Sequence, residues 1–169
     1  MRELYRRKID KFKQKNSMLM SNKKWLKFFT VMREFSDCEF YYKGIFSKDF
    51  AREFDFSSME VYETGLGDCL IGGPIEYEMI ESILIPIKAY LRMNLIKIYE
   101  YNNNFDRILA KLSKEGMFPV EHIKTNQENG IIINRDFVIY DYLIIKGYHH
   151  LPAPFSPLPR RGSRAKRMV

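Results

Sequence analysis

The chain has 169 residues, of which 46% are apolar and 15% aromatic, and a formal net charge of +7 at pH 7. This length and composition predict one domain with a substantial core, and they argue against a second core or a need for metal or disulfide. No apolar run reaches the roughly 18 residues that a membrane span needs. The first residues lack the apolar segment of a secretory signal, so we expect a cytoplasmic protein with reduced cysteines.

Charge is distributed unevenly along the sequence. Residues 1–33 carry a net charge of +9 and residues 160–169 one of +5, whereas residues 34–159 carry −7. Such asymmetry bears on binding partners rather than on the fold. We therefore expect three parts, namely a basic amphipathic arm (1–19), a single α+β domain (20–150) and a Pro/Arg-rich tail (151–169).

Two helices are predicted in the first part of the chain. Apolar residues recur at a roughly helical period among Arg and Lys over residues 2–15, which predicts a basic amphipathic helix. A second helix is expected to follow an N-cap at Ser21 or Asn22. Its apolar stripe, which we interpret as core packing rather than base stacking, comprises Trp25, Phe28, Phe29, Met32 and Phe35.

The middle of the chain is predicted to be mainly strands and turns. Residues 38–46 alternate in polarity, which predicts a half-buried strand with Phe46 on its apolar face. Residues 47–58 have no clear period and are expected to form a loop with a helical turn. Residues 59–64 are strand-like and end in a glycine-rich run.

Two glycine-rich turns are expected, at residues 65–68 and 72–74. The first lacks the Lys-Ser/Thr ending of a P-loop and the third glycine of a dinucleotide fingerprint, so we interpret it as a turn only. The sequence after the second turn alternates through Met79, which predicts another strand. Glu81 falls out of step, which predicts a β-bulge before the apolar run at 83–85.

The second half of the chain contains the most clearly predicted helix, which follows Asn103 or Asn104 and ends at Gly116. Residues 87–99 fit a strand or a helix, and we favour a strand over 93–99. The remaining expectations are strands at 120–123, 131–133 and 137–147, the last covered on both faces, with turns at 128–130 and 134–136. The predicted fold class is α+β, with a mainly antiparallel sheet, two or three packed helices, a basic N-terminal helix and a disordered C-terminal tail.

No motif in the sequence indicates catalysis, a cofactor or a metal site. His122 and the pair His149-His150 have no motif around them, and adjacent residues of a strand point to opposite faces. Cys69 follows Asp68 and a glycine turn, but no base accompanies it in the sequence. We therefore expect no enzyme activity, no cofactor and no metal.

One stretch of the chain is acidic and lacks bases, since the nearest Lys or Arg residues are Arg52 and Lys88. This stretch is either a solvated sheet face or a docking surface for a basic partner, because clustered charge speeds encounter and selects partners. The residues expected to form that surface are Glu60, Glu63, Asp68, Glu76, Glu78 and Glu81.

Several short motifs occur in a fixed order along the chain. They are Trp25-Leu26-Lys27-Phe28, ETGLGD at 63–68, GGPIEY at 72–77, Ile85-Pro86, the helix end at 116–120 and Gly147-Tyr148. In this order, over residues 22–148, the sequence resembles a family of small uncharacterised bacterial proteins. The resemblance implies a compact α+β domain and transfers no catalytic residue. In type, the domain is similar to the acidic immunity proteins that protect bacteria from toxins, although the basic arm and tail depart from that pattern.

Three functions follow from these observations. The leading hypothesis is a non-catalytic binding protein of the immunity or antitoxin kind, whose acidic sheet face blocks a basic partner. The third hypothesis is a small hydrolase in which Glu76 and Glu78 hold Mg²⁺. The second hypothesis is a nucleic-acid-associated protein that binds phosphate with its two basic termini. Its expected binding residues are Arg6, Arg7, Lys11, Arg160, Arg161 and Arg164.

Overall fold

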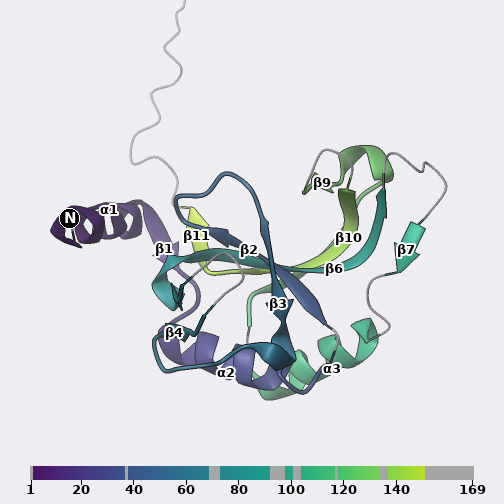
Figure 1. Ribbon diagram of the computed structural model, residues 1–169, viewed down its shortest axis with the longest axis horizontal. Helices are drawn as coiled ribbons and strands as arrows, with labels where there is room; N and C mark the ends of the chain where they lie inside the picture. The colour runs from purple at the N-terminus through teal and green to yellow at the C-terminus, as the bar shows by residue number, and fades with distance from the viewer. Residues whose placement is uncertain are drawn as a thin grey trace, which may run out of the picture.

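The computed structural model describes residues 2–36, 38–68, 73–91, 98–100, 104–116, 118–133 and 137–150. Over these residues the chain has the predicted α+β fold, with helices packed on a mainly antiparallel sheet (Figure 1). The elements are α1 (Arg2–Lys15), β1 (Asn16–Met18), α2 (Asn22–Met32), β2 (Glu39–Gly44), β3 (Ala51–Asp55), η1 (Phe56–Ser58), β4 (Gly65–Leu66), β5 (Ile75–Glu76), η2 (Tyr77–Met79), β6 (Ile80–Leu91), β7 (Ile98–Glu100), α3 (Phe105–Glu115), β8 (Val120–Lys124), η4 (Gln127–Asn129), β9 (Ile131–Ile132), β10 (Phe137–Lys146) and β11 (Tyr148–His150).

The main sheet has the order β3-β2-β6-β10-β8, while β7 also pairs with β6 and β9 with β10. Each of these pairings is antiparallel. The long strand β10 lies between β6 and β8, and its apolar residues pack on both faces of the sheet, since Leu143 and Ile145 join one apolar cluster and Ile139 and Tyr142 another. This confirms the prediction of a strand covered on both faces.

The pairing of β6 is irregular at two places, one at Glu81 and one next to Pro86. Pairing with β2 shifts between Lys43–Ser82 and Gly44–Ile80, which leaves Glu81 as an extra residue and confirms the predicted bulge. Further along, Pro86 lies opposite Tyr142 of β10, next to a second register shift. Proline is tolerated there because, among the described strands, none pairs with the other edge of β6 between the end of β2 and the start of β7.

The main core lies where α2 and α3 cover one face of the sheet (Figure 1). Helix α2 begins after Ser21, whose side-chain oxygen accepts a hydrogen bond from the Lys24 backbone N–H at 3.2 Å. Its aromatic stripe is buried, as predicted, and Phe29 lies at the centre of the aromatic cluster. The rings that contact Phe29 belong to Trp25, Phe28, Phe40, Phe56 and Tyr77.

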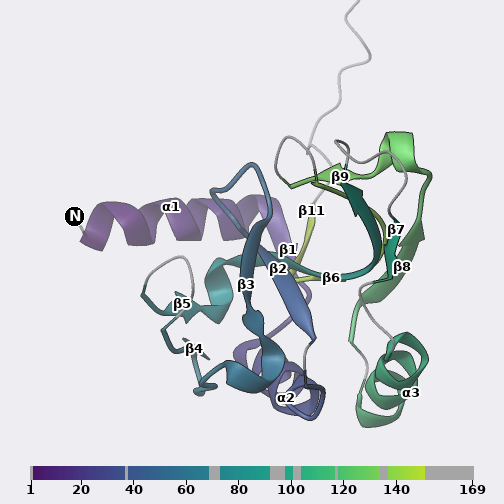
Figure 2. The same ribbon diagram turned by 45° about the vertical axis from the view of Figure 1, so that its right-hand side comes forward.

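The opposite face of the sheet carries a second, smaller apolar cluster built on Tyr41, Leu84 and Ile139. Strands β6 and β10 bend strongly along their length, so that this face is concave (Figures 1 and 2). The register shifts in β10 lie between Ile139 and Tyr142, in keeping with the bending that bulges produce.

Several local predictions are wrong. Strand β2 ends at Gly44, so Phe46 lies in the following loop and is 46% exposed instead of buried. Residues 47–58 contain the strand β3 as well as the expected helical turn. Residues 59–64 form only a single bridge, from Val61 to Leu66, and the predicted strand through Met79 is interrupted by η2. The expectations for residues 93–97, 134–136 and 151–169 lie outside the described residues.

Candidate functional site

Helix α1 packs against the domain along one stripe of its surface. Ile9 is only 3% exposed and packs with Ile45 and Tyr148, while the Phe12 ring meets the Tyr148 ring edge-on at 5.0 Å. The following strand β1 pairs with β11, and the Leu19 backbone N–H donates to the Gly147 carbonyl at 2.8 Å. The basic arm thus contacts the domain that we expected to begin at residue 20.

Figure 2 shows α1 between the β2–β3 connection on one side and β5 on the other. The two flanks of the helix therefore face different surroundings. On the flank toward β5 and η2, Arg6 donates to both carboxylate oxygens of Glu78, and Lys13 Nζ lies 2.7 Å from Glu78 Oε2. The chain's own N-terminal bases thus neutralise one of the predicted docking residues.

We expect Glu78→Gln to loosen α1 without unfolding the domain. The neutral amide removes the charge attraction to Arg6 and Lys13, and because Arg6 is half-exposed the loss should be about 1 kcal/mol or less. Tryptic cleavage within α1 should become faster, as followed by mass spectrometry. The matched control is Glu81→Gln, because Glu81 makes its ion pair with Lys43 of β2. Equal cleavage rates in the two variants would contradict the proposal that Glu78 holds α1 against the domain.

The six predicted docking residues separate into two groups. Glu78 and Glu81 are partly buried and ion-paired, the latter to Lys43 at 3.5 Å. The exposed group lies on or beside the β4–β5 strand pair and defines what we call the acidic hairpin, which comprises Glu60, Glu63, Asp68 and Glu76. Two hydrogen bonds hold this segment, since the Gly67 backbone N–H donates to the Glu60 carbonyl at 2.8 Å and the Tyr77 hydroxyl to the Tyr62 carbonyl at 2.7 Å.

Tyr62 lies among these acids and is 55% exposed. Its hydroxyl donates to Glu60 Oε2 at 3.3 Å. The negative charge of Glu60, chiefly, and of Asp68 raises the pKa of Tyr62 above its ordinary value, because ionising the phenol there would add a third negative charge. The acidic hairpin thus combines four exposed carboxylates with one exposed aromatic ring.

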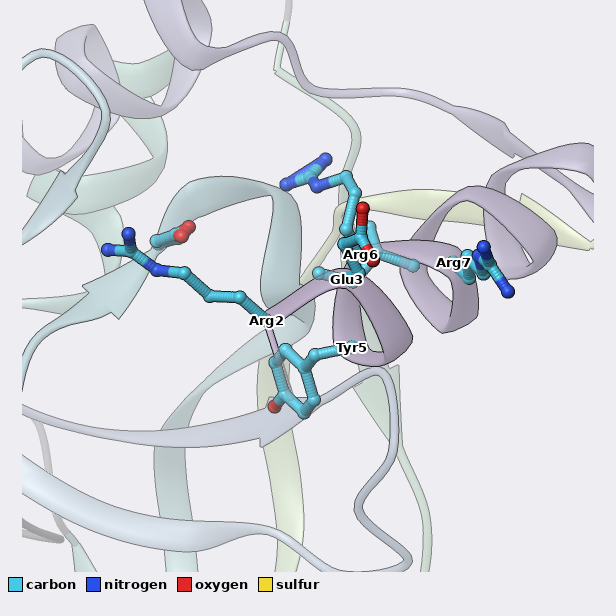
Figure 3. Close-up of a pocket in the computed structure, with 7 residues that line it drawn as sticks. Arg2, Glu3, Tyr5, Arg6 and Arg7 are labelled. Carbon is cyan, nitrogen blue, oxygen red and sulfur yellow. The ribbon is translucent and has the colours of Figure 1, made fainter.

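A groove of about 540 Å³ runs where the first turns of α1 meet the acidic hairpin at Glu76. Figure 3 shows Arg2 and Arg7 extending from α1 in opposite directions in this region. Of the expected phosphate-binding residues, Arg6 is engaged with Glu78 whereas Arg7 and Lys11 are exposed. Arg160, Arg161 and Arg164 lie outside the described residues.

The structure also pairs two residues that sequence reasoning did not connect. His122 Nε2 lies 2.6 Å from Oδ1 of Asp141, a buried carboxylate on β10, and the His122 ring packs on Phe105 of α3. A hydrogen-bonded pair of this kind orients an imidazole, but the described surroundings add no nucleophile to it. Only the β8–β10 pairing could have revealed this contact, since the two residues are distant in sequence.

Tyr148 connects α1 to the stability of the domain at high pH. Burial, and secondarily the Glu78 charge, raise the pKa of Tyr148 to about 12, while Arg6 opposes the increase. In the unfolded chain this phenol ionises near pH 10. The folded state therefore holds the proton more tightly, and its stabilising effect is complete below about pH 10 and is lost as the pH rises toward about 12.

We accordingly expect the free energy of unfolding to fall between about pH 10 and pH 12, and to fall less steeply in Tyr148→Phe. Urea titrations at several pH values test this, with tyrosinate absorbance reporting the ionisation. The variant also loses the hydrogen bond from the Tyr148 hydroxyl to the Glu78 carbonyl, so the comparison concerns the slope with pH and not the absolute stability. An unchanged slope would contradict the assignment.

Among the described residues, no three His, Cys, Asp or Glu side chains are grouped to hold a metal. Nor does any helix within the described ranges combine the length and apolarity required to cross a membrane. A scan against protein-family models and searches of curated proteins and solved structures each found no match to this chain.

Proposed function

We propose that the chain is a non-catalytic protein-binding domain of the immunity or antitoxin kind, which acts in the cytoplasm and blocks a partner with a basic surface. The acidic hairpin is the proposed docking surface. The observation that carries the proposal is the convergence of exposed carboxylates around an exposed tyrosine, in a stretch without Lys or Arg between Arg52 and Lys88. Blocking a partner requires charge and shape complementarity and no chemistry.

The composition of this surface suits protein recognition. Tyrosine is enriched among residues that dominate binding energy, and Tyr62 lies near the carboxylates of Glu60 and Asp68, which can meet Lys and Arg of a partner. The neighbouring Glu78 already binds Arg6 and Lys13 of α1, so the same side of the domain binds a basic helix of its own chain. A partner helix or loop with clustered bases would meet the adjoining acids that α1 leaves exposed.

The test is a charge reversal with a matched control. The genes beside that of this chain are first searched for a basic toxin domain, and that domain serves as the probe, with affinity measured by calorimetry and protection measured as growth on co-expression. We expect Glu60→Lys combined with Asp68→Lys to weaken binding at least about tenfold for each charge and to abolish protection. Glu121→Lys combined with Glu128→Lys makes the same charge change at exposed sites elsewhere and should retain both.

Two results would overturn the proposal. Equal effects of the two double variants would show that the acidic hairpin does not direct recognition. Hydrolysis of a substrate that requires Mg²⁺ and is lost in Glu76→Gln would show that the chain is an enzyme, and would favour the metal-dependent alternative.

A further inference from the structure

The second flank of α1, which faces away from the acidic hairpin, carries a different site. Lys8, Lys11 and Lys15 are spaced at i, i+3 and i+7 and so lie along one side of the helix. With Phe12, Asn16 and Phe46 they line a groove of about 280 Å³, which we call the lysine groove. Its walls come from α1 and from the β2–β3 connection, which contact each other through the rings of Tyr5 and Phe46.

The charges of the lysine groove are not neutralised within the described part of the chain. Lys13 on the other flank is bound to Glu78, whereas Lys8, Lys11 and Lys15 are exposed and make no ion pair there. A row of three such cations covers about 10 Å of helix, from the helical rise of about 1.5 Å per residue. That length matches about three nucleotides of a stacked strand at about 3.4 Å each.

Aromatic rings adjoin these cations. Phe46 is 46% exposed, and its ring contacts the ring of Tyr5, itself 51% exposed, edge-to-face at 5.8 Å. Because β2 ends at Gly44, the loop presents the Phe46 ring beside the lysine row instead of in the core. Exposed aromatic faces beside a basic row are what sequence-tolerant binding of single-stranded nucleic acid requires, since every base can stack.

The geometry points to the lysine groove as a binding site for single-stranded nucleic acid, with phosphates on Lys8, Lys11 and Lys15 and a base stacked on Phe46. A membrane surface fits less well, because an interfacial helix inserts its whole apolar stripe, whereas α1 already packs on the domain through Ile9 and Phe12 and exposes only Leu4 and Tyr5. Glu76 and Glu78, which would repel phosphate, lie on the opposite flank of α1. This inference is independent of the acidic hairpin's role.

The test compares two double charge reversals in the full chain, so that the tail contributes equally to both. Anisotropy of a short fluorescein-labelled oligothymidylate is measured over a salt series. Lys8→Glu with Lys11→Glu should weaken binding at least tenfold and reduce the salt slope by about 0.7 for each lost phosphate contact. Lys23→Glu with Lys24→Glu, the same charge change at exposed positions of α2, should reduce affinity much less and keep the slope.

Phe46→Ala separates stacking from charge. It should weaken binding at least about fivefold without changing the salt slope. Lys8→Gln with Lys11→Gln serves as a milder second variant, and circular dichroism checks that each protein is folded. Equal losses in the two reversed pairs, no measurable affinity for the oligonucleotide, or binding to phosphatidylserine vesicles instead would each overturn the inference.

Discussion

Replacing Phe29 with Ala is expected to lower the free energy of unfolding by about 3–5 kcal/mol, a large share of the stability of a domain this size. Phe29 is fully buried, and its ring contacts five other aromatic rings from α2, the main sheet and the 3-10 segments. The change removes apolar burial and leaves a cavity that a rigid cluster of rings cannot fill.

Urea unfolding followed by the fluorescence of Trp25, the single tryptophan of the chain, measures this effect because Trp25 contacts Phe29 directly. The control is Phe46→Ala, the same chemical change at a half-exposed position, which should alter stability by less than about 0.5 kcal/mol. A loss at Phe29 that is no larger than the loss at Phe46 would show that α2 is not packed as described.

Replacing Gly147 with Ala should destabilise the domain by about 1–3 kcal/mol through overpacking. Gly147 joins β10 to β11, and its N–H donates to the Glu81 carbonyl at 2.7 Å, beside the bulge. A Cβ at this position would overlap the Ile80 carbonyl oxygen and lie 3.2 Å from Trp25 Cζ2. Both neighbours are held by the core, so the backbone itself has to move.

Comparing the thermal unfolding temperatures of Gly147→Ala and Gly116→Ala checks this argument. At Gly116 the backbone is extended and a Cβ would meet only ordinary contacts, starting with Phe118 at 3.6 Å. The second variant should therefore unfold within a few degrees of the wild type, whereas the first should unfold at a clearly lower temperature. Equal shifts of the unfolding temperature in the two variants would mean that the close approach of Ile80 and Trp25 does not explain the glycine at position 147.

Elements with a strong local signal were predictable from the sequence. Helix α2 combines a cap with an apolar repeat, and α3 ends at a glycine, so local chemistry defines both. The bulge at Glu81 was predictable because a residue out of step with the alternation has to be accommodated somewhere. The wrong predictions concern short segments whose conformation depends on distant neighbours, such as β3, which forms by pairing with β2.

For the candidate site, the sequence predicted which residues are acidic or basic but not which of them meet. The acidic stretch is visible in the sequence, but the ion pairs of Glu78 with Arg6 and Lys13 cross more than sixty residues of chain. The sequence indicated an amphipathic basic helix without showing which acid it meets or that its two flanks differ. Phe46 was assigned to a core face because alternation continues past Gly44, although the strand does not.

The pairing of β1 with β11 has a consequence for synthesis of the protein. Met18 pairs with Tyr148 and Asn16 with His150, so the partner of β1 leaves the ribosome after almost all of the domain. Until then α1 lacks Tyr148, one wall of its docking site, although Ile45 and Glu78, which also contact it, are already synthesised. The β1–β11 seam therefore cannot close before residues 148–150 are synthesised, and a non-local contact of this kind slows folding.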